Sequence, residues 1–233
     1  MKTLSQADLA AIEAAVRDAE TRTTGEIYCV VAEASSSYGE TPLAWAAGVA
    51  LLAPALLLLG GVHVTIPDLF SSWSASEVGL AVETSVRQAL IGTIVLQGVL
   101  FVGTALLVAM PPVRRALTPR GLKRDRVRRR ATEQFLAKNL HLTRERTGIL
   151  IFVSLSERMA ELMADEGISG HVDAHVWDKA MSALTDGLKR SDPGAGFAAA
   201  VRLCAEVLAE KFPPREGDNP KELPDAVVVL PHP

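Results

Sequence analysis

The sequence predicts an α/β domain that is interrupted by a two-helix transmembrane hairpin. Two apolar runs, at residues 43–62 and 89–110, contain no Asp, Glu, Lys or Arg. Strand-like runs rich in β-branched residues lie on either side of them, at 26–34 and 148–155. One helix and one strand before the hairpin cannot bury enough apolar surface to fold alone. We therefore expect the segments before and after the hairpin to form one domain.

The two apolar runs have the length of membrane-spanning helices. At about 1.5 Å rise per residue, each crosses a hydrocarbon core of roughly 30 Å. Pro54 lies inside the first run, and membrane helices tolerate proline better than soluble helices do. These boundaries divide the chain into the first part of the domain at 1–42, the hairpin at 43–110 and the remainder of the domain at 114–233.

Basic residues predict how the hairpin is oriented. Residues 114–130 contain nine Lys and Arg residues against one Asp, whereas the loop at 63–87 contains only Arg87. Positive segments stay in the cytoplasm, so both termini are expected there. The basic segment also suits contact with anionic lipid headgroups. Neither a recognition motif nor interleaved aromatic residues accompany it, so we expect the lipid bilayer and no nucleic acid as a partner.

Helical and strand patterns predict the remaining elements. Ser5 and Asp8 form a capping-box sequence that opens the first helix. Helical spacing of apolar residues predicts three further helices, at about 123–140, 172–188 and 197–212. The almost wholly apolar run at 148–155 is expected to be a central strand, and 226–230 an edge strand. Residues 159–168 fit both a helix and the second arm of a hairpin. Cys29 and Cys204 are expected to be reduced and buried.

Several short stretches occur in an order that is typical of one family. They are Thr24-Gly25-Glu26-Ile27, the run 146–154 (RTGILIFVS), Ala164-Asp165-Glu166-Gly167-Ile168, Trp177, the run 194–197, Phe212-Pro213 and Glu222-Leu223-Pro224-Asp225. In their order and spacing the chain resembles the TPM domain family, in its branch of bacterial membrane proteins with a hydrophobic hairpin inserted after the first strand. The resemblance implies a multi-pass protein of the bacterial inner (plasma) membrane.

The resemblance also implies a fold and a range of activities. The fold is an α/β/α sandwich with a small mixed sheet, in which residues 158–168 form the second arm of a hairpin. Acid phosphatase activity is reported for a thylakoid-lumen member associated with photosystem II repair, and some members bind divalent cations through acidic residues at one end of the sheet. The family's usual Asp-Asp-Arg reads Ser156-Glu157-Arg158 here, and its glycine-rich continuation is missing.

Three carboxylates are the candidate metal ligands. Glu157, Glu161 and Asp165 would share one face of a strand, because side chains alternate with a period of two. Oxygen ligands of this kind suit Ca²⁺ or Mg²⁺. The alternative is a solvated acidic face with no ligand.

The functional expectation is a membrane-anchored interaction or maintenance factor for other membrane proteins, non-catalytic and with a divalent cation as a candidate ligand. The alternative is a metal-assisted phosphatase that acts on phosphoesters at the membrane surface; no catalytic residue is identified for it. Small residues on the second span allow close helix packing, which keeps a homo-oligomer open. They are Gly92, Gly98 and Gly103.

Overall fold

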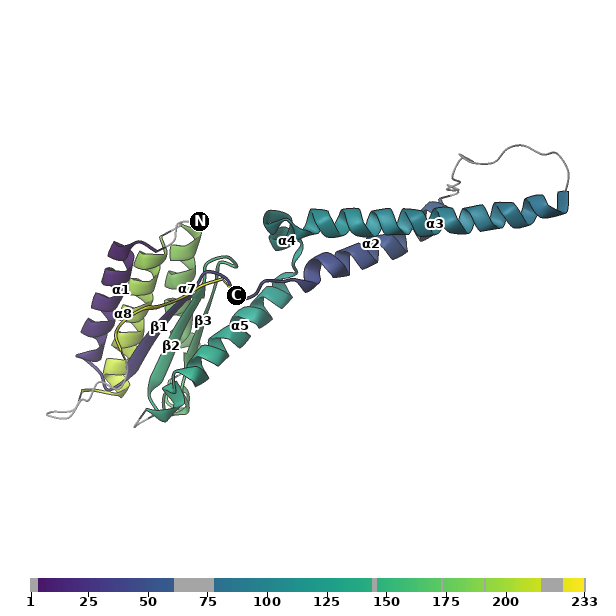
Figure 1. Ribbon diagram of the computed structural model, residues 1–233. Helices are drawn as coiled ribbons and strands as arrows, with labels where there is room; N and C mark the ends of the chain where they lie inside the picture. Colours follow the sequence, from purple (N-terminus) through teal and green to yellow (C-terminus); the bar gives the residue numbers. More distant parts are fainter. Residues whose placement is uncertain are drawn as a thin grey trace. The chain divides into compact units, whose positions relative to one another are not determined.

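The computed structural model describes residues 4–60, 78–143, 146–172, 174–190, 192–214 and 224–232 (Figure 1). The chain forms two compact units. One unit is Tyr38–Thr118, which we name the hairpin unit. The other combines Met1–Ser37 with Pro119–Pro233, and we name it the sheet unit.

A four-stranded mixed sheet forms the centre of the sheet unit. Its strands are β1 (Glu26–Ala32), β2 (Gly148–Ser154), β3 (Met159–Ala164) and β4 (Val228–Leu230), in the order β3-β2-β1-β4. β1 pairs in parallel with β2 and with β4, and β3 pairs antiparallel with β2. Every residue of β1 and β2 is buried. The strand before the hairpin therefore pairs with strands that follow it, and β2 is central, as the sequence predicted.

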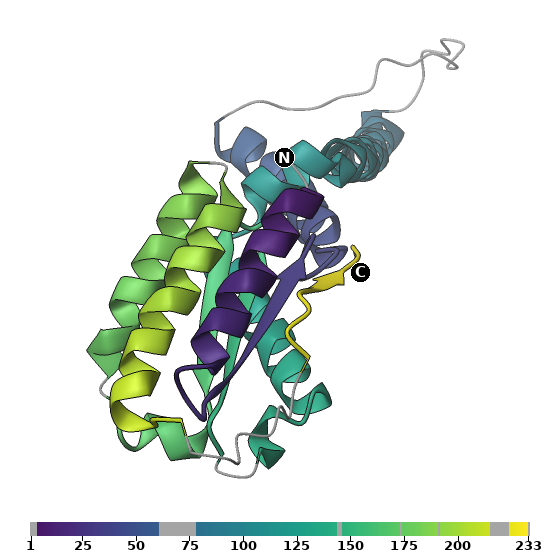
Figure 2. The same ribbon diagram turned by 90° about the vertical axis from the view of Figure 1, so that its left-hand side faces the viewer.

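Three helices cover one face of the sheet. They are α1 (Gln6–Glu20), α7 (Ala174–Lys189) and α8 (Pro193–Lys211), seen as one layer in Figure 2. Ile12, Leu184 and Phe197 are fully buried in the core of this layer. The predicted capping box opens α1: the Asp8 backbone N–H donates to Ser5 Oγ at 3.2 Å, and the Ser5 N–H donates to the Asp8 carboxylate at 2.8 Å.

A single long helix, α5 (Arg120–Ala137), covers the other face. Val127, Ala131 and Phe135 recur every four residues and pack in one cluster with Tyr28 and Phe152. A short 3₁₀ helix, η1 (Leu140–Leu142), follows α5. The sheet unit thus has three layers, with helices on both faces of the sheet.

The segment after β2 is a strand followed by a short helix. The expected hairpin arm at 158–168 is correct only as far as Ala164, where β3 ends. Residues 166–169 form α6 (Glu166–Ser169), because the Asp165 side chain accepts from the Glu166 N–H at 2.7 Å and caps a helix there. The predicted edge strand at 226–230 is β4, which is confined to its last three residues.

Both cysteines are free and buried, as predicted. Burial raises the pKa of Cys204 to about 12 and also raises the pKa of Cys29. Only the thiolate is a strong nucleophile. These two thiols are therefore unreactive packing groups at neutral pH.

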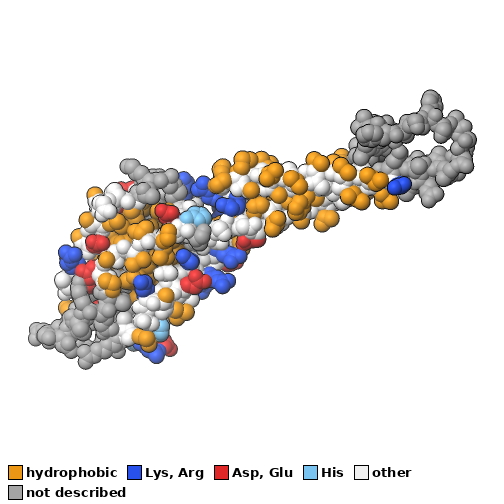
Figure 3. Space-filling view, viewed as in Figure 1, with side chains coloured by type: hydrophobic (Ala, Val, Ile, Leu, Met, Phe, Trp, Pro, Cys, Tyr) orange, Lys and Arg blue, Asp and Glu red, His pale blue; other side chains and the backbone are white. Residues whose placement is uncertain are grey.

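The hairpin unit contains α2 (Glu40–Leu59), α3 (Val78–Ala109) and α4 (Pro111–Leu117). Segments of α2 and α3, Glu40–Leu57 and Ala89–Ala109, are long and apolar enough to cross a membrane, judged by length and composition. Residues 61 and 62 of the first predicted span lie outside the described residues. Figure 3 shows hydrophobic side chains over these two helices.

Small residues make the contact between α2 and α3. Ala46, Ala50 and Pro54 are buried and recur every four residues along α2, whereas large apolar side chains such as Leu51 and Leu56 are exposed. Near the start of α2, the indole Nε1–H of Trp45 donates to the Leu117 carbonyl at 3.2 Å, which ties α4 to α2.

We expect Gly187→Ala to destabilise the sheet unit. A Cβ at Gly187 in α7 would lie 2.5 Å from the Cα of Gly196 in α8 and 2.9 Å from the Asp192 carbonyl oxygen. Both neighbours are backbone, so the two helices must separate, at a loss of about 1–3 kcal/mol in the free energy of unfolding. Urea unfolding of the full chain in detergent measures this loss.

The matched control is Gly121→Ala in α5, where a Cβ meets nothing within 4 Å. There the substitution only restricts the unfolded chain and favours the helix, so a small gain in stability is expected. Equal effects of the two substitutions would show that the α7–α8 contact is not the constraint described here.

Candidate functional site

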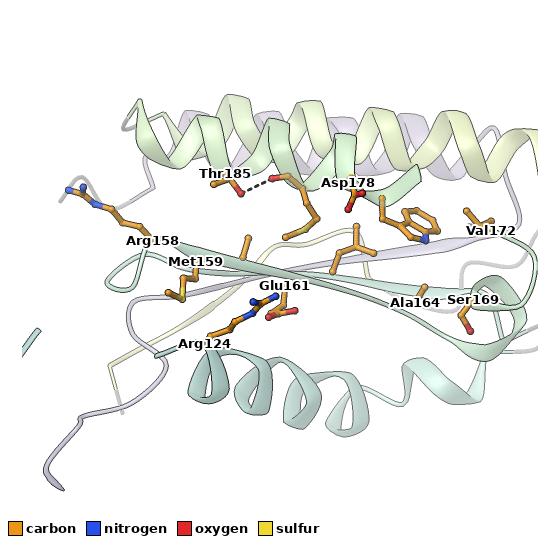
Figure 4. A pocket seen from close by; sticks show the side chains of 13 residues that line it. Arg124, Arg158, Met159, Glu161, Ala164, Ser169, Val172, Asp178 and Thr185 are labelled. Carbon is orange, nitrogen blue, oxygen red and sulfur yellow. Dashed lines mark hydrogen bonds between the residues drawn. The ribbon is translucent and has the colours of Figure 1, made fainter. Parts of the chain in front are cut away.

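A groove with a volume of about 660 Å³ runs along β3 (Figure 4). It lies between α5 on one side and α7 on the other. Sites of this volume are typical of small-molecule and cofactor binding. The lining residues are Arg124, Arg158–Leu162, Ala164, Ser169, Val172, Trp177, Asp178, Met181 and Thr185.

The groove exists because β3 is the edge strand of a sheet that has helices on both faces. All six residues of β3 are half-buried, in contrast to the fully buried β1 and β2. α5 and α7 both contact β3 from opposite faces. Among the described residues, no further strand pairs with β3 on its outer side. The two helix layers thus form the walls of a slot that continues the plane of the sheet.

The alternation of β3 side chains gives the two walls different chemistry. Ala160, Leu162 and Ala164 pack with the core beneath α7, and the half-buried Trp177 and Met181 of α7 continue this apolar wall. Met159 and Met163 pack with the core beneath α5.

Glu161 shares the α5 side with Met159 and Met163, because side chains alternate along a strand. Figure 4 shows the side chains of Glu161 and Arg124 pointing toward one another. One wall is therefore apolar and the other is charged.

Glu161 is a half-buried carboxylate in this groove. Burial raises its pKa above the ordinary value of a glutamate, since desolvation disfavours the charged form, and the positive charges of Arg124 and Arg128 oppose that rise. A titratable group with a raised pKa in a groove is a recognised sign of a functional site.

The backbone of β3 presents hydrogen-bonding groups to the groove. The Glu26 N–H donates to the Thr147 carbonyl, and the Leu155 N–H donates to the Ala32 carbonyl. The odd-numbered residues of β2 therefore direct their N–H and C=O groups toward β1. The even-numbered residues of β2 face β3, as the Asp165 N–H to Gly148 carbonyl bond of 2.9 Å confirms. Since bonding alternates along an antiparallel pair, the N–H and C=O groups of alternate β3 residues turn outward. These residues are Ala160, Leu162 and Ala164.

The three carboxylates proposed as metal ligands have separate neighbourhoods. Glu157 lies in the turn between β2 and β3 rather than in a strand. Its carboxylate accepts from the Ser35 N–H at 3.2 Å and from the Ser154 hydroxyl. Glu157 thus ties the turn to the segment that follows β1.

Asp165 lies at the opposite end of β3, where one of its oxygens caps α6. Its second oxygen, Oδ2, is buried and has no hydrogen-bond partner among the described residues. Residues four apart along a strand are separated by about 13 Å, so a shared face does not bring Glu157, Glu161 and Asp165 together. Within the described ranges, no group of three or more His, Cys, Asp or Glu side chains is arranged to hold a metal ion.

Sequence reasoning singled out Glu161 and Trp177 but not the groove that contains them. Arg124 belongs to a basic run that was explained by membrane orientation and by contact with anionic lipid headgroups. Arg124 and Arg128 are four residues apart, which places both on one side of α5. That spacing was the available signal, but only the pairing of β2 with β3 shows which element faces that side.

We expect the raised pKa of Glu161 to make stability depend on pH. The folded state holds this proton more tightly than the unfolded chain, so the free energy of unfolding falls as pH rises from the ordinary glutamate pKa through the raised one. Glu161→Gln removes the charge. The variant should therefore unfold at a higher temperature than the wild type at neutral pH, and the difference should vanish below the ordinary pKa.

Thermal unfolding of the full chain in detergent across this pH range measures the effect. Glu206→Gln, at an exposed position of α8, is the control and should leave the unfolding temperature nearly unchanged at every pH. A wild type that is more stable than Glu161→Gln at neutral pH would mean that Arg124 and Arg128 outweigh the burial of the carboxylate.

Comparison with known proteins identifies a shared fold. No family model matches the chain, and no curated protein matches it. Among solved structures, the chain is similar to the BA42 protein from the psychrophilic bacterium Bizionia argentinensis, determined by NMR. The TM-score is 0.55 at 17% sequence identity, and the match covers 98% of this chain and 96% of that one. At this identity the similarity concerns the fold alone.

Proposed function

We propose that this protein is a membrane-anchored binding module of the bacterial inner membrane that acts in the assembly or maintenance of other membrane proteins. The groove along β3 would be its binding site for a partner protein. The observation that carries the proposal is an open groove with one apolar and one charged wall, in a folded unit that is attached to two helices of membrane-spanning length.

Two features support membrane anchoring with the sheet unit in the cytoplasm. Large apolar side chains of α2 and α3 are exposed, as expected of helices that face lipid. Nine basic residues follow the second span within residues 114–130, which favours the cytoplasm for that segment. The pairing of β1 with β2 supports an arrangement in which the segments before and after the hairpin share one side of the membrane. The resemblance to the TPM domain family is consistent with this arrangement.

A binding role has more support than the alternative of a metal-assisted phosphatase. The phosphatase would require carboxylates that converge on a metal ion and a phosphate group. Glu157 instead accepts a hydrogen bond in the turn before β3, and Asp165 caps α6 after the other end of β3. Glu161 faces Arg124 and Arg128 rather than another acid.

The proposal is tested by crosslinking in native membranes. The full chain carries a photo-crosslinking amino acid in place of Met181, which lines the groove, or in place of Arg202, which is exposed on α8 away from it. We expect adducts of defined mass from position 181 that are absent from position 202. Identical adducts from both positions, or none from position 181, would contradict the proposal.

An activity assay tests the alternative of a metal-assisted phosphatase. Purified protein in detergent is incubated with a generic phosphomonoester, with and without divalent cations. We expect no turnover above that of a heat-denatured sample. Turnover that requires a divalent cation and is lost in Glu161→Ala would favour the phosphatase instead.

A further inference from the structure

We infer that the groove binds its partner as an additional β-strand: an extended segment of another protein pairs with the outer edge of β3, and its side chains alternate between acidic and apolar. This inference rests on the proposed binding role of the groove and specifies what is bound. Three features of the groove support it, namely the backbone of β3, the space beside it and the charges on its walls.

The backbone of β3 is arranged to pair with another strand. Ala160, Leu162 and Ala164 direct their N–H and C=O groups outward, and in the described part of the chain no strand pairs with them. Edge strands with such rows are templates for added strands, and an extended peptide gains its affinity from them. The six residues of β3 span about 20 Å, which matches a peptide of about six residues.

The groove leaves space for the added strand. Three residues of β3 point to the α7 side, Ala160, Leu162 and Ala164. Two of them are alanines, whose small side chains leave space for the side chains of an incoming strand. Trp177 and Met181 of α7 border this space. They offer apolar surface to every second side chain of an incoming strand, and methionine adapts its shape to different partners.

Charge selects the other side chains of the partner. Arg124 on α5 and Arg158 in the turn line the groove, and Arg128 lies close enough to influence Glu161. On this side, the positive charges of Arg124 and Arg128 oppose the single carboxylate of Glu161. The other lining carboxylate, Asp178, is exposed on α7. An acidic side chain is therefore favoured toward α5. Because strand side chains alternate between faces, the partner segment alternates acidic and apolar residues.

Peptide binding to the full chain in detergent micelles tests this inference. The probe is a fluorescent hexapeptide that alternates glutamate and valine, and binding is measured by fluorescence anisotropy. One comparison peptide has lysine in place of glutamate; another has three glutamates followed by three valines. We expect the alternating glutamate peptide to bind at least tenfold more tightly than either. Equal binding of the three, or no binding of the first, would overturn the inference.

Backbone methylation of the probe tests the strand geometry. Methylating the alternate nitrogens that face β3 should weaken binding at least tenfold, whereas methylating the other set should change it little. A slip by one residue cannot restore the bonds, because it would exchange the acidic and apolar faces. Loss of affinity from both sets, or from neither, would overturn strand addition.

Charge reversal tests the wall that α5 provides. In Arg124→Glu the preference for the glutamate peptide over the lysine peptide should fall at least tenfold. Arg129→Glu is the matched control, since Arg129 is an exposed arginine of the same helix that pairs with Glu133 and does not line the groove. It should leave the preference unchanged. The same loss in both variants would point to nonspecific attraction and overturn the charge assignment.

Failure of this inference is distinguishable from failure of the proposed function. Adducts from position 181 together with no alternating pattern in the peptides would overturn strand addition and leave the binding role intact. Peptides that bind in the predicted pattern while position 181 gives no adducts in native membranes would support the geometry and contradict the cellular role. Dimers that form with increasing protein concentration and dissociate when the peptide is added would identify a second copy of this chain as the occupant of the groove. That result would overturn the inference that the partner is a different protein.

Discussion

A fragment that begins at residue 119 should not fold, whereas the same fragment joined to residues 1–37 by a flexible linker should fold as a water-soluble domain. β1 lies between β2 and β4 and is buried over its whole length. Its removal exposes both core clusters, since Ile27, Cys29 and Val31 belong to one and Tyr28 and Val30 to the other. In the described part of the chain β4 pairs only with β1, so without β1 the sheet is reduced to the hairpin of β2 and β3, and β2 loses its parallel partner along its whole length.

Circular dichroism and the dispersion of amide NMR signals measure this difference. The control is the linked protein with Val30→Asp, which has the same length but places a charge at a position with 0% exposure. A buried unpaired carboxylate is strongly destabilising, so this variant should resemble the short fragment. Cooperative unfolding of the fragment without residues 1–37 would show that β1 is not required for the fold.

Leu184→Ala should lower the free energy of unfolding of the full chain by about 2–5 kcal/mol. Leu184 lies in α7 with 0% exposure, between the sheet and α8. Truncation removes favourable burial and leaves a cavity, because helices held on both sides by other elements close in only partly.

Leu136→Ala is the matched control, because it makes the same substitution on α5 in the same unit at a side chain that is 53% exposed. Its effect should lie within about 0.5 kcal/mol. Urea unfolding of both variants in the same detergent gives the comparison. Equal losses at the two positions would contradict the core described for the α7 layer.

The sequence was most informative where burial repeats with a regular period. Val127, Ala131 and Phe135 define the inner side of α5, and the apolar run of β2 identifies a strand with neighbours on both faces. β3 was ambiguous for a physical reason: its sequence, MAELMA, consists of good helix formers. Pairing with β2 overrides that preference, and this long-range contact leaves no local pattern.

The candidate site was harder to predict than the fold. Periodicity placed Glu157, Glu161 and Asp165 on one face, but a face says nothing about distance along the strand. The groove also depends on residues from separate elements, Arg124 of α5 and Trp177 of α7, which line it from opposite sides of β3. Neither local sequence indicates that the two residues border the same groove.

The insertion of the hairpin between β1 and β2 has a consequence for biosynthesis. Ribosomes make β1 first, and its partner β2 emerges only after both apolar helices. If those helices enter the bilayer as a pair, the two strands meet in one compartment. If only one helix crosses the bilayer, β1 and β2 lie on opposite sides of it and cannot pair. For helices that cross a membrane, pairing of β1 with β2 therefore requires that both of them cross it.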